Sequence, residues 1–240
     1  MALAHKIIQA VPKPIRNLVS PIKNRLIDKN SSELSFWASR LKIDKGVFSN
    51  AHYRRIMLAM AEEGDDSFLK GKIVADFGCG PRGSLVWAKA AALRIGIDVL
   101  ADRYADEFTD NILSHEMVYL KSTEKIIPLP SNFVDVMYTL NAIDHVDSFP
   151  DVCGEIIRVM KPGGTFIGSF NLEEPASPNE PQQLNEKIIK RDLLNHLDIE
   201  SYRATVPGPE DDQFAPFYSG KLHYKAGQLG FLWVRARKKP

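Results

Sequence analysis

The sequence predicts an α/β fold in which helices cover both faces of a mostly parallel, doubly wound sheet of seven strands. The first observation is a short apolar run, residues 73–77, that leads into a turn with glycines at positions 78, 80 and 83. This pattern is typical of a buried parallel strand that turns around a ligand. The second observation is the alternation of further strand-like runs with helical patterns. The third is the composition, because 44% hydrophobic and 25% charged residues are ordinary values for a globular domain.

The first thirty residues differ in character from the rest and are expected to form a helical N-terminal extension. They contain one acid, Asp28, and six bases, which are Lys6, Lys13, Arg16, Lys23, Arg25 and Lys29. Apolar residues recur at helical spacing along one stripe, and prolines divide the segment into short helices. We therefore expect residues 1–30 to be a basic amphipathic segment that could lie on an anionic membrane. The same pattern would suit a helix packed on the main domain, residues 31–240, or an unattached tail.

Two helices are expected between this extension and the first strand. Ser32 is a candidate N-cap for the first helix and Asn50 for the second, because serine and asparagine cap helices well. Phe36 and Trp37 lie on the first of these helices, at a spacing that is typical of core packing.

The alternation of helix and strand begins after the glycine turn. Residues 84–93 are expected to form the first crossover helix. A second strand-like run, residues 94–98, ends in Asp98. A helix over residues 101–108 and a strand over residues 117–120 should follow.

The second half of the chain continues this alternation. The expected elements are a strand over 133–140, a helix over 149–160 stopped by a Pro-Gly-Gly sequence, a strand over 165–170, a helix over 185–197, and strands over 199–205 and 230–237. The final strand is expected to run antiparallel. Two polar segments, near residues 171–184 and 206–220, are expected to be inserts that form lids over the site. The second combines aromatics with carboxylates, which suits a sugar ring and equally suits a solvated loop.

Two acids at the ends of neighbouring strands indicate the kind of ligand. Asp98 is placed to accept hydrogen bonds from both ribose hydroxyls of a nucleoside, which suits NAD as well as S-adenosylmethionine (SAM). Asp76 lies directly before the glycine turn, where a carboxylate would repel a pyrophosphate. The same carboxylate would attract the cationic amino group and sulfonium of SAM. The pair therefore favours SAM over NAD.

Four stretches, in the expected order, resemble the class I SAM-dependent methyltransferases, and more particularly their small-molecule branch. They are Val74-Ala75-Asp76-Phe77-Gly78-Cys79-Gly80, Gly96-Ile97-Asp98, residues 133–137 running on to 141–146, and residues 155–164 with the ending Arg158-Val159-Met160-Lys161-Pro162-Gly163-Gly164. The resemblance covers roughly residues 71–170. It implies a Rossmann-like sheet and SAM as the cofactor.

The resemblance also implies which residues hold the cofactor. Helices ahead of the first strand cover the methionine end of the donor in this family, so Tyr53 and Arg54 are candidates for the donor carboxylate or the acceptor. Val99 and Leu100 are placed to flank the adenine. The loop that begins at Ser122 is placed to meet the adenine amino group, although many relatives carry Asp there. The expected cofactor-binding residues are Tyr53, Arg54, Asp76, Gly78, Cys79, Gly80, Gly83, Asp98, Val99, Ser122, Thr123, Glu124 and Asn141.

His145 is the expected catalytic base, with Asp144 as its alternative or as the group that orients it. Methyl transfer is a displacement at a carbon that the sulfonium already activates, so the enzyme mainly aligns the reactants and excludes water. A hydroxyl or amine acceptor must still lose a proton, and histidine is suited to accept it near neutral pH. His145 could equally be a histidine that bonds backbone at a helix start. With Asp147 the two residues could also ligate a divalent ion, but nothing else completes such a site, so no metal is expected.

Composition restricts the partners and the compartment. The formal net charge of +1, without a basic groove or stacking platform, argues against a nucleic-acid partner. The only cysteines, Cys79 and Cys153, are too few for a disulfide framework, which favours a reducing, cytoplasmic setting. No apolar run is long enough to span a bilayer.

The expected function is methyl transfer from SAM to a small polar acceptor, most simply a hydroxyl of a sugar or glycan. A lipid-linked acceptor would suit the basic N-terminal segment. Two alternatives stay open: an RNA or protein methyltransferase, and a non-enzymatic partner protein that keeps the fold. The sequence indicates neither the acceptor nor the oligomeric state.

Overall fold

The computed structural model describes residues 29–123, 125–177, 180–209, 212–221 and 223–240. Nearly all of the expected basic segment, residues 1–28, lies outside the described residues. The helices and strands are α3 (Lys29–Ile43), α4 (Ala51–Ala61), η1 (Asp66–Leu69), β1 (Ile73–Phe77), β2 (Leu93–Asp98), α5 (Ala101–Glu107), α6 (Thr109–Ser114), β3 (Val118–Lys121), β4 (Val134–Leu140), η2 (Ile143–His145), α7 (Phe149–Val159), β5 (Met160–Leu172), α8 (Glu186–Asp192), η3 (Leu194–His196), β6 (Leu197–Thr205), α9 (Ala215–Tyr218) and β7 (Gly230–Lys238).

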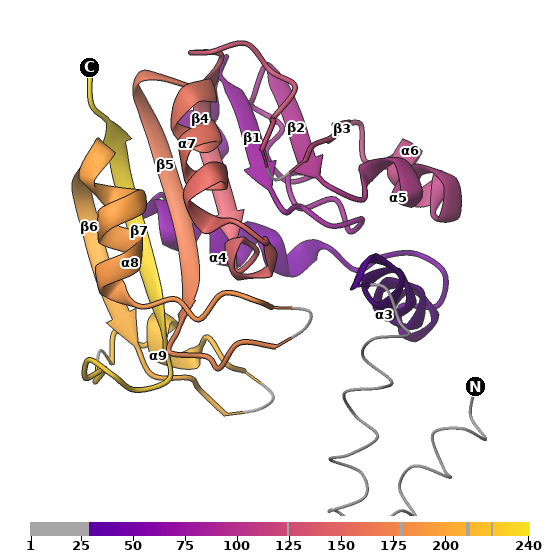
Figure 1. Ribbon diagram of the computed structural model, residues 1–240. Helices are drawn as coiled ribbons and strands as arrows, with labels where there is room; N and C mark the ends of the chain where they lie inside the picture. The colour runs from indigo at the N-terminus through magenta and orange to yellow at the C-terminus, as the bar shows by residue number, and fades with distance from the viewer. Residues whose placement is uncertain (1–28, 124, 178–179, 210–211, 222) are drawn as a thin grey trace, which may run out of the picture.

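The sheet has seven strands in the order β3-β2-β1-β4-β5-β7-β6. The first five strands of this order pair in parallel, and β7 runs antiparallel to both β5 and β6. The chain therefore winds outward from β1 in both directions, which confirms the expected doubly wound Rossmann-like sheet and its antiparallel last strand. In this topology ligands bind outside the carboxyl ends of the central strands, where the winding direction changes. Figure 1 shows β1, β2 and β4 ending on the side of the sheet where α3 lies.

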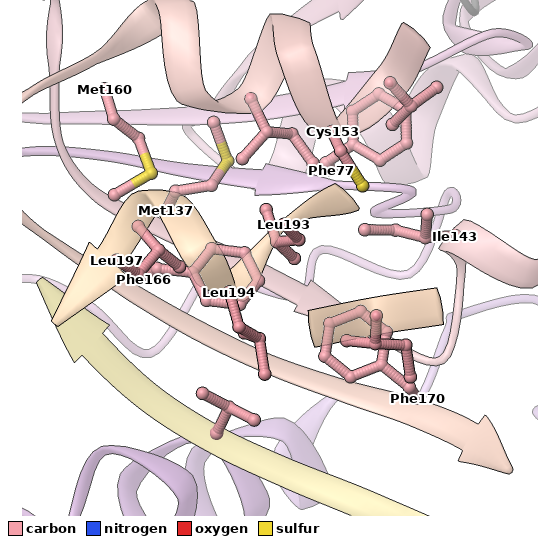
Figure 2. Close-up of a cluster of buried hydrophobic side chains, with 14 of the residues drawn as sticks. Phe77, Met137, Ile143, Cys153, Met160, Phe166, Phe170, Leu193, Leu194 and Leu197 are labelled. Carbon is pink, nitrogen blue, oxygen red and sulfur yellow. The ribbon is translucent and has the colours of Figure 1, made fainter. Parts of the chain in front are cut away.

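Helices α7 and α8 cover one face of the sheet (Figure 1). Figure 2 shows Cys153 of α7, Met137 of β4 and Phe166 and Phe170 of β5 directed into one cluster, together with Leu193. Each side chain of this size contributes roughly 1.5–3 kcal/mol when it is fully buried. The cluster fixes the position of α7, and with it the loop between β4 and α7.

Helices α4 and α9 cover the opposite face. Met57 and Met60 of α4 and Phe217 of α9 share a second cluster with Val74 of β1 and Trp233 of β7. The alternation along β1 explains the division, because Ala75 belongs to the first cluster while its neighbour Val74 belongs to the second.

Helix α3 belongs to a third and smaller cluster. Its Leu34 is buried together with Phe48 and with Leu100, Tyr104 and Phe108, which lie around α5. Since α5 follows β2 directly, this packing holds α3 over the carboxyl ends of the central strands. No helix within the described residues is long and apolar enough to cross a membrane.

The prediction of a crossover helix over residues 84–93 is wrong, because most of this segment forms a series of turns. Its local backbone bonds join residues two or three apart, as from the Val86 N–H to the Gly83 carbonyl at 3.1 Å. The Arg94 guanidinium donates to the carbonyl of Val86 at 3.1 Å and so occupies an acceptor that an α-helix would use. Leu85 and Ala88 are nevertheless buried against the sheet, so the turns cover the face that a helix was expected to cover.

Several expected helix boundaries also differ from the structure. Helix α3 begins at Lys29, so Ser32 is not its N-cap. Asn50 is the residue before α4, but its side chain makes no capping bond. The expected helix over 185–197 is a shorter α8 followed by η3 and the start of β6. Asn185 caps α8, since its side chain accepts a hydrogen bond from the Ile188 N–H at 3.0 Å.

Candidate functional site

A cavity of about 1170 Å³ opens at the carboxyl ends of β1, β2 and β4. Its walls come from α3, Tyr53 of α4, the glycine turn after β1, the ends of β2 and β3, the first turn of α5, and the loop from Asn141 to Asp147. Glu180, from the polar segment after β5, adds to the wall. We call this space the first cavity.

The glycine turn brings the backbone close to two other parts of the chain. Gly78 and Gly80 have φ angles of 73° and 56°, in the left-handed region that side chains disfavour. A Cβ on Gly78 would lie 2.2 Å from the Cβ of Ala142, and one on Gly80 would lie 2.8 Å from the ring of Trp37. The turn is therefore held between α3 and the loop after β4, with no room for side chains.

Asp98 closes the turn from the neighbouring strand. Its two carboxylate oxygens accept hydrogen bonds from the N–H of Gly80 at 3.0 Å and of Leu100 at 2.9 Å. Burial raises the pKa of Asp98 to about 6, although these two backbone bonds act in the opposite direction.

Asp76 is a second buried carboxylate in the wall of the first cavity, and it is only 2% exposed. Its Oδ2 accepts a hydrogen bond from the Ser84 hydroxyl at 2.5 Å, while its Oδ1 is buried without a hydrogen-bond partner. Burial raises the pKa of Asp76 to about 7; the Ser84 bond opposes this shift and the nearby Asp98 carboxylate adds to it. A buried acceptor without a partner is costly unless a ligand supplies the donor.

Helix α3, one of the helices expected to cover the donor, contributes a wall of the first cavity. Core packing was the competing expectation for Phe36 and Trp37; both line the cavity, Phe36 is 49% exposed, and Trp37 also packs against the third cluster. The Trp37 indole N–H donates to Glu33 at 2.8 Å, which holds the ring across the glycine turn. The sequence signal for this wall was an acid, Glu33, close to two aromatic residues on one helix ahead of the first strand.

The loop after β4 carries the expected catalytic residues. Asn141, at its start, has a φ of 44°, an unusual value for a residue other than glycine, and its side chain accepts a hydrogen bond from the Ser169 hydroxyl at 2.5 Å. The Nε2 atom of His145 lies 3.5 Å from Oε1 of Glu180 and 3.9 Å from Oδ1 of Asp144. Backbone strain such as that at Asn141, held in place by surrounding bonds, is common where a loop is shaped for a ligand.

Most of the expected site residues meet in the first cavity. Those that line it are Tyr53, Asp76, Gly78, Cys79, Gly80, Asp98, Val99, Ser122, Thr123, Asn141 and His145. Leu100, expected beside Val99, lines it as well. Residues that line it without having been expected include Ser32, Glu33, Asp102, Arg103, Tyr104, Lys121, Val146, Asp147 and Glu180.

Four of the expected residues do not line this cavity or cannot be placed. Arg54 is exposed on α4, outside the first cavity. Gly83 faces the His115 ring, from which a Cβ would be only 2.7 Å away. Asp144 belongs to the loop after β4 but does not line the cavity; it is buried and accepts a hydrogen bond from the Asn171 amide at 2.8 Å. Glu124 lies outside the described residues.

A second cavity of about 640 Å³ adjoins the first. The two have five lining residues in common, which are Phe36, Trp37, Tyr53, Leu140 and Asn141. The remaining wall of the second cavity comes from α3, α4, Arg82 and the segment around α9. The two cavities thus meet at the end of β4, beneath the aromatic side chains of α3.

Comparison with known families identifies the domain to which this site belongs. Residues 75–168, which hold the glycine turn, Asp98 and the loop after β4, match the family model described as a methyltransferase domain. Residues 75–168 thus match a methyltransferase domain, and the chain shares its fold with solved SAM-dependent methyltransferases. This confirms the resemblance of the four sequence stretches and decides between SAM and NAD in favour of SAM.

Relatives within the methyltransferase family differ in what they methylate. The chain is 31% identical over 125 residues to sterol 24-C-methyltransferase ERG6 of Saccharomyces cerevisiae. The matched region covers 47% of this chain and 31% of that protein. It is 30% identical over 94 residues to malonyl-[acyl-carrier protein] O-methyltransferase of Enterobacter lignolyticus, covering 39% of this chain and 36% of that one. The chain thus spans about a third of the length of these relatives.

Solved structures of the family share the fold. A SAM-dependent methyltransferase from Mesorhizobium loti superposes with a TM-score of 0.55 at 16% identity, over 76% of this chain and 96% of that one. At this identity the likeness concerns the fold alone.

The residues of the first cavity fit the cofactor of the methyltransferase family. SAM carries a cationic amino group, which the unpartnered buried Oδ1 of Asp76 could accept as a hydrogen-bond donor. The Ser122 hydroxyl is also buried without a partner in the wall of this cavity, where a heteroatom of the ligand could bond it. Within the part of the chain that the structure describes, no three His, Cys, Asp or Glu side chains are grouped so that they could hold a metal ion.

Proposed function

We propose that this protein transfers a methyl group from SAM to a hydroxyl of a small polar acceptor. The observation that carries the proposal is the pair of buried carboxylates, Asp76 and Asp98, beside the glycine turn in one wall of the first cavity. When bound, SAM supplies a methyl group already activated by its sulfonium, so the chain mainly has to bind and align the reactants.

Asp76 and Asp98 would hold the two polar parts of the donor. Asp98 keeps lone pairs for ribose hydroxyls after accepting its two backbone hydrogen bonds, because a carboxylate offers about four acceptor positions. Asp76 would take the amino group through Oδ1. The ring of Trp37 would cover the donor from the side of α3 and exclude water.

The acceptor would reach the methyl group where the two cavities meet. Tyr53, Leu140 and Asn141 border both spaces, so an acceptor that enters the second cavity could approach a donor held in the first. In an in-line displacement the attacking oxygen and the leaving sulfur lie on opposite sides of the methyl carbon. Two adjoining cavities allow this arrangement.

His145 is the proposed base for the acceptor hydroxyl. It lines the first cavity, is about a third exposed, and lies 3.5 Å from the Glu180 carboxylate, which could stabilise the imidazolium after proton transfer. Asp144 does not line the cavity, so we assign it a positioning role: it accepts a hydrogen bond from Asn171, and its carbonyl accepts one from the Gln182 N–H at 3.4 Å. Among the relatives, a malonyl-[acyl-carrier protein] O-methyltransferase supports oxygen as the target atom, while the sterol C-methyltransferases favour carbon.

The two polar inserts take different parts in this proposal. The segment near 171–184 bonds to the loop after β4 through Asn171 and Gln182, and Glu180 faces the first cavity, so it would act as a lid on the donor side. The segment near 206–220 would instead be a fixed wall of the second cavity. Phe217 in it is buried and stacks on Trp233 with ring centres 4.2 Å apart.

Calorimetric titration with S-adenosylhomocysteine tests the donor site. We expect the wild type to bind it, and Asp98→Ala to weaken binding by at least tenfold, ~1.4 kcal/mol, because ribose hydroxyls would lose their acceptor. Asp151→Ala, an exposed acid on α7 that lines neither cavity, is the matched control. A wild type that does not bind, although circular dichroism shows it folded, would refute the proposal and favour the non-enzymatic partner protein.

A further inference from the structure

The charged side chains of the second cavity are mostly basic. Arg40, His52, Arg55 and Arg82 line it, and Asp212 is the one acid among its described lining residues. The first cavity has the opposite character around the glycine turn, where Asp76 and Asp98 are buried. The two buried acids thus line the first cavity, whereas the three arginines line the second.

Two of these arginines are held by aromatic rings. The guanidinium of Arg55 lies 3.9 Å from the centre of the Tyr218 ring, and that of Arg40 lies 5.7 Å from the centre of the Phe36 ring. Neither forms an ion pair with a carboxylate of the described residues. A cation placed over a ring is oriented but keeps its N–H groups available for an anion.

Arg82 reaches the second cavity from the glycine turn. One of its terminal nitrogens pairs with Asp44 at 2.7 Å, and its Nε is buried without a hydrogen-bond partner. The Arg82 side chain is only 13% exposed, so this missing bond cannot simply be left to bulk water. A donor in this state indicates a site built for an acceptor-bearing ligand.

We propose that the second cavity binds the methyl acceptor through an anionic group, a phosphate or a carboxylate, attached to a ring or other apolar body. Arg40, Arg55 and Arg82 would bind the anion, since the planar guanidinium matches both groups. Phe36, Phe214 and Tyr218 would pack against the body of the acceptor. This inference rests on the proposed function, because it assigns to the second cavity the acceptor of that reaction.

Asp212 gives the proposal a charge of the opposite sign to test. It lies on the wall formed by the segment around α9, facing the same space as the arginines. Its carboxylate would repel an anionic acceptor, so removing it should strengthen binding. A purely structural role of the arginines predicts no such gain.

The test uses the full chain loaded with S-adenosylhomocysteine and titrated with three probes: phenyl phosphate, benzoate and the neutral benzyl alcohol. We expect an anion to bind more tightly than the alcohol, and the double variant Arg40→Gln, Arg55→Gln to weaken that anion by roughly tenfold or more. Comparison of phenyl phosphate with benzoate shows which anionic group the site takes. Asp212→Asn should strengthen the same anion. Lys42→Gln with Lys70→Gln, which removes two exposed charges outside both cavities, is the matched control.

Three results would overturn the inference. One is a wild type that binds both anions no better than the alcohol. Another is equal weakening in the lysine control, which would mean that only the overall charge matters. The third is a loss of S-adenosylhomocysteine affinity in the arginine variant, which would assign these arginines to the donor carboxylate. A wild type that binds S-adenosylhomocysteine but no anion refutes this inference alone, whereas one that binds neither refutes the proposed function as well.

His52 offers a second readout that does not depend on affinity. Burial lowers the pKa of His52, and among the charged groups near it Arg82 and Arg40 lower it further while Asp44 raises it. An anion bound beside these arginines would offset their effect. Nuclear magnetic resonance titration should therefore find a higher His52 pKa with phenyl phosphate present and no such rise with benzyl alcohol.

Discussion

At the residue scale, the donor site depends on two carboxylates that are buried for different purposes. Asp98 accepts hydrogen bonds from the Gly80 N–H of the glycine turn and from the Leu100 N–H, so it stabilises the turn even without a ligand. Asp76 keeps one oxygen without a partner, so part of its burial is compensated only when a donor binds. Asp76 is therefore the residue whose ionisation should follow occupancy of the site.

This difference predicts a pH dependence of donor binding. Burial raises the pKa of Asp76 to about 7, and a cationic amino group binds the ionised carboxylate better than the protonated one. The affinity for the donor should therefore increase as the pH rises through 7 and decrease as the pH falls below 7. Calorimetry of S-adenosylhomocysteine at several pH values measures the effect.

Asp76→Asn provides the control for that titration. This variant should bind weakly at every pH and lose the rise near neutrality, while any change at lower pH that belongs to Asp98 remains. An unchanged pH profile in Asp76→Asn would contradict the assignment of the amino group to Asp76.

The sequence predicted those site residues whose position follows from strand ends. Asp76, Asp98 and Asn141 each lie at or next to the carboxyl end of a strand of the sheet, and such ends converge in this topology. The wall formed by Trp37 and the basic side chains of the second cavity could not be found this way. Except for Arg82 of the glycine turn, they come from helices whose packing against the sheet depends on tertiary contacts that no local pattern specifies.

At the scale of elements, the helix that is missing after the glycine turn is as informative as those that form. The pattern of residues 84–93 predicted correctly which side chains are buried, since Leu85 and Ala88 do pack on the sheet. The conformation differs from a helix, and the carbonyls of Leu85 and Val86 accept hydrogen bonds from Arg94 of the following strand. Such a competitor lies outside the window in which periodicity is judged.

Helix α7 allows a test of element stability that leaves the site untouched. Gly154 lies in its interior on the exposed side, and a Cβ there would meet nothing within 4 Å. Gly154→Ala should therefore stabilise the fold by about 0.4–1 kcal/mol, because alanine loses less backbone freedom in a helix. Chemical denaturation followed by circular dichroism measures the change.

Gly164→Ala is the opposite case and serves as the comparison. A Cβ at this position would lie 2.8 Å from the Lys161 carbonyl, so this variant should be destabilised. If Gly154→Ala also lowered the denaturation midpoint, the exposed placement of this side of α7 would be wrong.

At the scale of the whole molecule, the basic N-terminal segment remains a sequence-based prediction, since residues 1–28 lie outside the described residues. Six bases against one acid favour an anionic surface, with about 1 kcal/mol for each base near it. We expect the full chain to sediment with anionic vesicles and less so as salt increases, because salt screens these charges.

The matched variants for this experiment remove equal charge. Lys13→Gln, Arg16→Gln and Lys23→Gln together should release the chain from the vesicles, whereas Lys42→Gln, Lys70→Gln and Lys187→Gln should not. Equal sedimentation of both variants would mean that the segment has another use, such as packing on the domain.

The two cavities have five lining side chains in common. A ligand that shifted Trp37, Tyr53 or Asn141 in one space would therefore reshape the other. By reciprocity, the factor by which a bound donor changes the affinity for the acceptor must equal the factor by which the acceptor changes the affinity for the donor. The order in which substrates arrive and products depart would then be set by this shared wall, rather than by either pocket alone.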